Sequence, residues 1–196
     1  MNSPQVKILD TWRALGMRGT GSHDILIEGY VVPEGAIALQ RKTGEWHPLF
    51  QVIATIAFPL VYSVYLGVTE SARDIALALA KKKQSKHFVE LAGRLDTELT
   101  GARLAHESML SAVRLNAPSA ATVNQVMIGK QLVTCHATAA VDLAMELAGG
   151  AGFYRAADLE QRFRDIQAAR YHPLQSRSQA EFAGAMALGL PVDQIF

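Results

Sequence analysis

The sequence predicts a mainly α protein, in which an up-down four-helix bundle follows a short β segment. Two observations predict this fold class. After residue 44, long stretches repeat apolar residues at the three-to-four spacing of amphipathic helices, and Pro or Gly separates these stretches. Before that point, residues 25–32 alternate in the manner of a strand. With 49% hydrophobic residues among 196, the chain is long enough to bury a core of its own.

The N-terminal segment, residues 1–44, is predicted to be the trailing end of a β domain. The sequence ILIEGYVV at 25–32 is rich in β-branched residues and ends at Pro33. The preceding GMRGTGSHD is typical of a connecting loop. A single pair of strands is too small to form a stable sheet alone. We therefore divide the chain into a β remnant at 1–44 and a helical domain at 45–196.

The first predicted helix contains an uncharged stretch of 21 residues, LFQVIATIAFPLVYSVYLGVT at 49–69. By length alone this stretch could cross a bilayer. Its polar residues, the lack of Trp or Lys/Arg anchors close to both ends, and the charged helical sequence that follows argue against a membrane span. We predict instead a helix opened by Pro48 that is buried on nearly all sides, partly by other copies of the chain.

Two further long helices are predicted at 87–115 and 120–147. Each carries a stripe of apolar residues at helical spacing. Pro118 follows the end of the first, and Gly149-Gly150 follows the end of the second. Short connections between long helices favour antiparallel neighbours in a bundle.

A fourth helix is predicted to begin at Asp158, because Asp158 and Gln161 have the spacing of a capping box. It should end by His172, since a residue before proline is disfavoured in the α conformation. A last helix is predicted at 174–188.

Charge and cysteine content limit the partners and the compartment. Lys and Arg total 19 against 18 Asp and Glu, so a net charge of +1 provides no electrostatic basis for binding nucleic acid or an anionic membrane. A single cysteine, Cys135, fits a reducing cytoplasm. The N-terminal sequence has no apolar signal region, so we expect a cytoplasmic protein. The histidines show no metal-ligand spacing, and no metal site is predicted.

The sequence RDIQAARYHP at 164–173 is the most specific polar cluster. Arg164 and Asp165 could simply cover a helix face, with His172 at the C-terminal end of that helix. Alternatively, the cluster could be functional. Seven residues correspond to two helical turns, so Asp165 and His172 would share a face at about 10 Å, too far for a direct hydrogen bond.

A glycine cluster, Gly149, Gly150 and Gly152, resembles part of a dinucleotide-binding fingerprint. That fingerprint requires a preceding strand, whereas a helix precedes these glycines. The simplest interpretation is a helix C-cap followed by a tight turn, with close approach of a ligand to the bare backbone as a secondary role.

Two stretches of the chain resemble the acyl-CoA dehydrogenase family of flavoproteins. WRALGMRGTGSHDILIEGYVVPEGAI at 12–37 is similar to the end of that family's middle β domain. ELAGGAGFYRAADLEQRFRDIQAARYHP at 146–173 is similar to its GG-x-G turn and the R-D helix that follows. The resemblance implies the family's C-terminal four-helix bundle preceded by an incomplete middle domain. It also implies an FAD or FMN cofactor, and homodimers or homotetramers formed through the bundles.

The same resemblance implies which residues contact the flavin. The GG-x-G turn of the family often contacts flavin across a subunit interface. Carried over to this chain, the contacts would come from Gly149, Gly150 and Gly152, with Arg164 and Asp165 nearby.

One departure from the family pattern concerns the catalytic base. Many members place a Glu eight residues after the Asp of R-D, where this chain has Pro173, which cannot act as a base. The R-D…H-P form is similar to a branch that includes flavin-dependent monooxygenases. His172 then becomes the candidate catalytic acid/base, because an imidazole titrates near neutral pH.

A second departure is that the sequence resembles only the later part of the family's chain. We therefore expect an incomplete acyl-CoA dehydrogenase-like, FAD-dependent oxidoreductase, which would act on CH–CH groups if complete and need not bind flavin alone. The alternatives are a flavin-dependent monooxygenase-related subunit and a non-catalytic helical oligomerisation module. The expected partners are further copies of the chain, with a separate N-terminal half or a flavin reductase as additional candidates.

Overall fold

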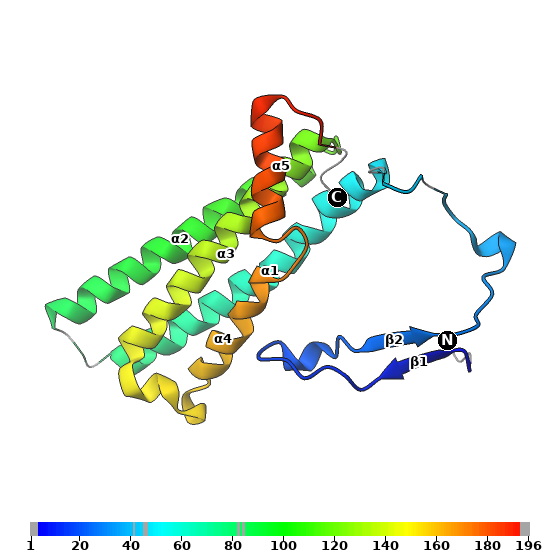
Figure 1. Cartoon of the computed structure of the whole chain (residues 1–196). Coiled ribbons are helices and arrows are strands. Elements are labelled where there is room, and N and C mark those ends of the chain that lie inside the picture. Colours follow the sequence, from blue (N-terminus) through cyan, green and yellow to red (C-terminus); the bar gives the residue numbers. More distant parts are fainter. Residues whose placement is uncertain (1–3, 41, 45–46, 82, 84, 193–196) are drawn as a thin grey trace.

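Three long antiparallel helices form most of the molecule: α1 (Pro48–Ala80), α2 (Lys86–Arg114) and α3 (Ala120–Ala148) (Figure 1). This computed structural model describes residues 4–40, 42–44, 47–81, 83 and 85–192. Each long helix packs against the other two along its length.

The chain then returns along the bundle in shorter pieces. Helix α4 (Leu159–Ile166) lies against α1 and α3, while α5 (Ser176–Leu188) packs on α3 near the opposite end (Figure 1). Three short 3₁₀ segments connect these helices: η3 (Gly149–Phe153), η4 (Arg155–Ala157) and η5 (Gln167–Arg170). The predicted fold class, a mainly α chain with a short β segment before its helices, is confirmed.

Local sequence signals explain two of the helix starts. Pro48 occupies the first turn of α1, where its missing N–H costs nothing, and the His47 ring accepts a hydrogen bond from the Leu49 backbone. At the start of α3, Ser119 and Thr122 form a reciprocal capping box.

The capping box predicted at Asp158 is wrong. Asp158 adopts a left-handed conformation with φ 57°, and its side chain makes no capping hydrogen bond. A capping residue normally has extended backbone angles, which direct its side chain toward the free N–H groups of the first turn. The 3₁₀ turn of η4 that leads into Asp158 imposes a different geometry.

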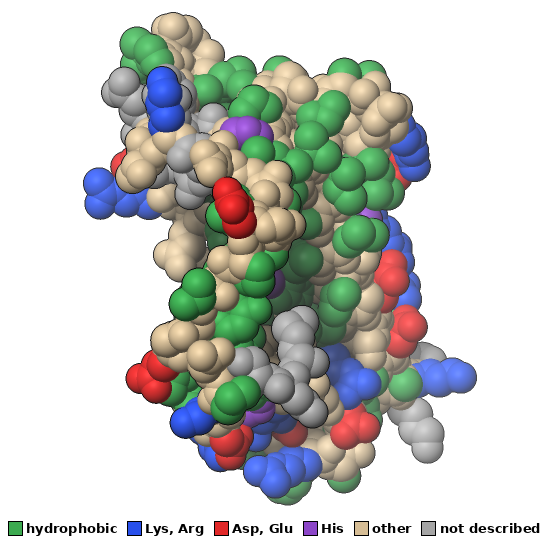
Figure 2. Space-filling model, turned by 90° about the vertical axis from the view of Figure 1, so that its right-hand side faces the viewer, with side chains coloured by type: hydrophobic (Ala, Val, Ile, Leu, Met, Phe, Trp, Pro, Cys, Tyr) green, Lys and Arg blue, Asp and Glu red, His purple; other side chains and the backbone are tan. Residues whose placement is uncertain are grey.

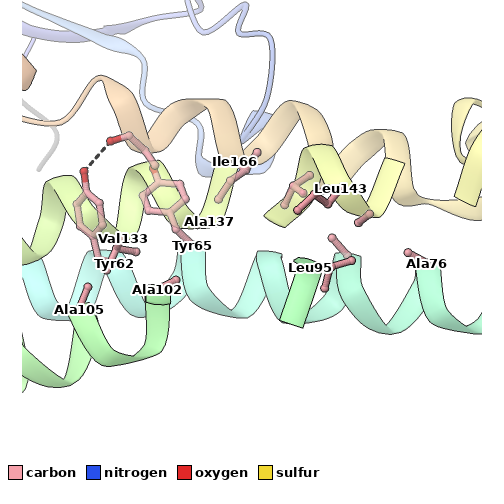
Figure 3. Packing of buried hydrophobic residues seen from close by; sticks show 14 of the residues in the cluster. Tyr62, Tyr65, Ala76, Leu95, Ala102, Ala105, Val133, Ala137, Leu143 and Ile166 are labelled. Carbon is pink, nitrogen blue, oxygen red and sulfur yellow. Dashed lines mark hydrogen bonds between the residues drawn. The ribbon is translucent and has the colours of Figure 1, made fainter. Parts of the chain in front are cut away.

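The core lies where the long helices face one another, and Figure 3 shows it from close by. Small residues such as Ala72, Ala76 and Ala102 are fully buried at the helix contacts and allow close approach. Ile166 from α4 closes the same cluster. The largest fully buried apolar and aromatic side chains are Tyr62, Leu91, Leu95, Leu99, Met109, Leu147 and Leu159.

The β segment consists of two short antiparallel strands, β1 (Val6–Leu9) and β2 (Asp24–Ile27), paired from Val6 opposite Ile27 to Leu9 opposite Asp24. The observed strand β2 is therefore shorter than the strand predicted at 25–32. It ends before Gly29, whose φ of +65° turns the chain out of the extended conformation. The division at residue 44 stays a prediction.

The predicted burial of α1 on nearly all sides is not met within one chain. Ile53, Ile56, Leu60 and Val64 lie on one face of α1 and are exposed. Figure 2 shows many hydrophobic side chains around a hollow on the side of the molecule that it presents. Among the described residues, α1 is also the one helix long and apolar enough to cross a membrane by length and composition. That it does not enter a membrane stays a prediction.

Candidate functional site

A cavity of about 600 Å³ lies between the loop that precedes β2 and the helices α1 and α4. Most of its wall is apolar, and the hollow is visible in Figure 2. Its principal lining residues are Trp12, Leu15, Met17, Val61, Val64, Tyr65, Ala168, Tyr171 and His172. A concave apolar site with a few polar groups is the usual form of a small-molecule binding site.

Two of the polar groups in this wall form a hydrogen-bonded pair. The Tyr65 hydroxyl lies 2.6 Å from His172 Nε2, and both side chains line the cavity. The two rings are tilted, with centroids 5.5 Å apart, and the buried Tyr62 ring lies edge-on to His172 at 5.9 Å. Helix α1 therefore fixes the imidazole from one side.

A third group, Lys130 of α3, is buried behind this pair. Its Nζ donates a hydrogen bond of 2.6 Å to the carbonyl of Leu174, two residues after His172. The same Nζ lies 5.7 Å from the centroid of the Tyr62 ring. Tyr62 in turn donates to the carbonyl of Ala169 at 2.6 Å, as the dashed line in Figure 3 shows.

Burial sets the protonation of these groups at neutral pH. Burial, with a smaller effect of the Lys130 charge, holds the pKa of His172 below its ordinary value. Burial raises the pKa of Tyr65, and the charge of Asp165 raises it further. The phenol therefore keeps its proton, and the hydrogen bond between Tyr65 and Nε2 can run in either direction, because a neutral imidazole carries its one proton on either ring nitrogen. The arrangement presents a neutral, oriented imidazole, which is the form that can accept a proton.

Arg164 and Asp165 hold the N-terminal loop against the bundle. Asp165 Oδ1 accepts a 2.5 Å hydrogen bond from the backbone N–H of Met17, and an Arg164 amino group donates to the carbonyl of Leu15 at 3.1 Å. Arg164 also pairs with Glu160 at 2.7 Å. These contacts place the loop that forms one wall of the cavity.

The loop approaches α4 so closely that only glycine fits at position 16. A Cβ atom there would lie 2.2 Å from the carbonyl oxygen of Arg164. Met17 follows with a left-handed φ of 51°, which turns its N–H toward Asp165. The Arg-Asp pair thus already has partners within the chain, and its predicted flavin contact stays a prediction.

The glycine turn lies far from His172 in the same chain. Gly149 has a φ of +64°, Gly150 has open space around it, and Gly152 is buried against Leu159. Counting α3 from Lys130 to its C-terminal end, the turn is about 27 Å along the helix axis from the level of the imidazole. One chain therefore does not bring the predicted glycine contacts and His172 to one point.

The regular helix expected from Asp165 to His172 is not observed, and their expected separation stays a prediction. The α-helix ends at Ile166, and the tighter η5 and a non-helical turn separate it from His172. The two side chains therefore do not lie two regular turns apart on one helix face. Instead, Asp165 faces the N-terminal loop and His172 faces Tyr65.

Tyr65 and Lys130 were not identified from the sequence. Both residues nevertheless stand out from the residues around them in the sequence. Tyr62 and Tyr65 interrupt the uncharged stretch with hydroxyl groups one helical turn apart, and Lys130 is the one Lys or Arg in the helix predicted at 120–147. Their partners lie 107 and 44 residues away, so the spacing within one helix could not name them. Among the described residues, no group of three His, Cys, Asp or Glu is placed to hold a metal.

The structure defines a helical-bundle domain that forms one wall of an apolar cavity. Residues 61–177 match the family described as acyl-CoA dehydrogenase, C-terminal domain, and the chain belongs to this family. The resemblance found in the sequence is thereby confirmed.

The relatives of known name include an amino sugar nitrososynthase and proteins solved with a bound flavin. The chain is 26% identical over 199 residues to amino sugar nitrososynthase DnmZ of Streptomyces peucetius. This match covers 95% of the chain and 49% of DnmZ. The structure of KijD3 in complex with FMN and a dTDP-linked amino keto sugar matches with a TM-score of 0.90 and 25% identity, over 98% of this chain and 50% of KijD3.

A further structure, XiaF from Streptomyces in complex with FADH2 and glycerol, matches with a TM-score of 0.78 over 95% of this chain and 54% of XiaF. At 23% identity this likeness shows the fold alone. The chain spans about half the length of these relatives.

Proposed function

We propose that the chain is the C-terminal part of a flavin-dependent oxidoreductase in which His172 transfers a proton at the cavity. The observation that carries this proposal is the pair of buried Tyr65 and half-buried His172, 2.6 Å apart, in the wall of an apolar cavity of about 600 Å³. Family membership supports the oxidoreductase class. The similarity to a nitrososynthase and to an FMN-bound protein favours the monooxygenase-related branch over a dehydrogenase acting on CH–CH bonds.

The residue at position 173 supports the monooxygenase-related branch. A dehydrogenase needs a carboxylate base to remove an α-proton, and the residue at the family's usual position is Pro173. The imidazole of His172 lies next to that position and faces the cavity. In the proposed reaction, the Nε2–H of neutral His172 donates to the Tyr65 oxygen, which orients the imidazole, and Nδ1 accepts a proton from the substrate. The apolar walls exclude water.

The cavity suits a flavin ring system. Val61, Val64 and Ala168 offer flat apolar contact, and Trp12 adds an indole ring to the same wall. A bound flavin, either FAD or FMN, would supply the electron-transfer chemistry. The glycine turn is too far along α3 to serve the same flavin from one chain, so we propose that Gly149, Gly150 and Gly152 contact the flavin of a second copy.

Partners would complete the site. Because the chain spans about half of its relatives' length, we propose that an N-terminal half supplies the remaining walls. We also propose a cytoplasmic homodimer or homotetramer formed through the bundles, outside any membrane. A flavin reductase would provide reduced flavin if the reaction consumes oxygen.

Flavin binding and His172 substitution test the proposal. Titration of FMN and FAD into the protein, alone and with an N-terminal half, should quench flavin fluorescence. In the active assembly, His172→Ala should lower turnover at least about 100-fold, whereas His87→Ala, at an exposed histidine on α2, should leave it unchanged. Normal turnover of His172→Ala would remove the imidazole from the mechanism.

The exposed face of α1 supports a second candidate, a non-catalytic helical oligomerisation module. Ile53, Ile56 and Leu60 form a contiguous apolar surface that a second helix could cover. Such a module would be oligomeric without flavin and would bind none. Light scattering that shows a monodisperse monomer would exclude it.

A further inference from the structure

Lys130 has a buried position that the proposed reaction does not explain. The side chain is 1% exposed, and the structure gives its ammonium group one hydrogen-bond acceptor, the Leu174 carbonyl. Among the residues that the structure describes, no carboxylate forms an ion pair with it. Burying a cation without a counter-ion is costly, so a residue of this kind is unfavourable for stability alone.

The segment that Lys130 contacts has little backbone support of its own. The 3₁₀ segment η5 ends at Arg170, and α5 begins at Ser176. His172 lies between them, next to Pro173, which has no backbone N–H to donate. Side-chain contacts must therefore set the direction of the imidazole. Tyr65 supplies the contact on the ring, and Lys130 supplies the contact on the backbone that follows it.

We propose that Lys130 is a positioning residue, which holds the turn from His172 to Leu174 in place and so aims the imidazole at Tyr65 and the cavity. Lys130 touches neither the cavity wall nor a reacting atom, and it acts through Leu174. The catalytic part of this proposal rests on the proposed function of His172. Its structural part, the dependence of the imidazole on Lys130, stands on the geometry alone.

The charge of Lys130 adds a second effect. The titratable groups that face the imidazole are Tyr62 and Tyr65 from α1 and Lys130 from α3, with Asp165 of α4 acting on Tyr65. Among them, Lys130 is the cation, and its charge adds to burial in lowering the pKa of His172. Removing that charge should make the imidazole easier to protonate.

NMR titration of the full chain with isotope-labelled histidine tests the proposal directly. The His172 signals are assigned by their loss in His172→Gln. In Lys130→Met, which keeps the length and apolar stem but lacks charge and donor, the pKa of His172 should rise. Tyr65→Phe should shift the His172 Nε2 signal in the natural protein, because it removes the hydrogen bond. In Lys130→Met the same Tyr65→Phe change should leave that signal almost unchanged. The matched control is Lys86→Met, the same change at an exposed lysine.

A second variant separates the hydrogen bond from the charge. Lys130→Gln keeps a donor on a side chain one bond shorter, so it should raise the pKa of His172 while preserving much of the Tyr65 contact. This variant also serves if Lys130→Met fails to give a folded circular dichroism spectrum. Unchanged His172 signals in the folded variants would overturn the proposal.

Turnover of the active assembly provides the independent readout. Lys130→Met should lower kcat at least about tenfold with KM little changed, and it should move the acidic limb of the pH–rate profile upward with the pKa of His172. If His172→Ala retains normal turnover while Lys130→Met still shifts the His172 signals, the proposed function fails and the positioning role stands. A normal kcat and pH profile in Lys130→Met, with His172 essential, would refute positioning in catalysis.

Discussion

The bundle and the N-terminal segment are stabilised in different ways. The bundle buries apolar side chains from α1, α2, α3 and α4 in one continuous cluster. In the described part of the segment before α1, Gly16 is the one buried residue, and its strands leave Ile8 and Ile25 exposed by 73% and 61%. The segment is instead held by a few polar contacts with α4, at the edge of the cavity.

This difference predicts which substitutions would unfold the bundle and which would alter only the cavity. One wall of the cavity belongs to a rigid core, and the other belongs to a loop fixed through Leu15, Gly16 and Met17. Changes in the core should therefore alter the free energy of unfolding, whereas changes in the loop contacts should alter the cavity with little effect on the bundle.

The largest expected effect is in the bundle core. Leu95 is fully buried, so Leu95→Ala should lower the free energy of unfolding by about 3 kcal/mol through lost burial and the cavity left behind. Ile8→Ala on the exposed strand should change it by less than about 0.5 kcal/mol. Urea denaturation followed by circular dichroism measures both. Equal effects would show that the β segment shares the cooperative core.

The next effect concerns Lys130 and pH. Burial lowers the pKa of Lys130 to about 8, so the folded state releases this proton more readily than the unfolded state, whose pKa is near 10.5. The destabilisation is fully present below pH 8 and is relieved as pH rises toward 10.5. Raising the pH from 8 to 10 should therefore stabilise the natural protein by about 2 kcal/mol relative to Lys130→Met. Parallel pH dependence in the two proteins would contradict a buried, protonated Lys130.

A smaller effect is expected where the loop meets α4. In Gly16→Ala the new Cβ would overlap the Arg164 carbonyl, so the loop must move away, at a cost of about 1–2 kcal/mol. Gly19→Ala is the matched control, because its Cβ would meet no atom within 4 Å. Limited proteolysis should cleave the segment faster in Gly16→Ala while the bundle stays resistant. Equal cleavage in both variants would show that the loop is not held at Gly16.

The smallest effect is expected for the carboxylate that fixes Met17. Asp165→Ala removes the acceptor of the Met17 N–H and should loosen the loop by about 1 kcal/mol. Hydrogen exchange at the Met17 amide should quicken, and exchange within α3 should not. Asp165→Asn, which keeps an acceptor oxygen, should restore much of the protection. Faster exchange throughout the bundle would mean that Asp165 supports the core as well.

The sequence by itself determined the helices and the family. Helix positions follow from local periodicity, from Pro48 and from the residues around Gly149, and the observed bounds of α1, α2, α3 and α5 agree with the prediction within one or two residues. Helix α4 instead ends at Ile166, well before the predicted end at His172. The Asp158 cap failed because the preceding 3₁₀ turn, rather than the residue type, decided its backbone conformation. Spacing also singled out His172, but it described the residue only as the end of a helix.

Tertiary structure alone decided how the site is built. His172 contacts Tyr65, which lies 107 residues away on α1, and Leu174 contacts Lys130, which lies 44 residues away on α3. Met17 contacts Asp165 across 148 residues. Such contacts depend on how whole helices pack, which no local pattern encodes. Burial then changes the chemistry of each group, because removing water from an imidazole, a phenol or an ammonium group disfavours its charged form. The protonation states in the cavity wall are therefore properties of the packed bundle.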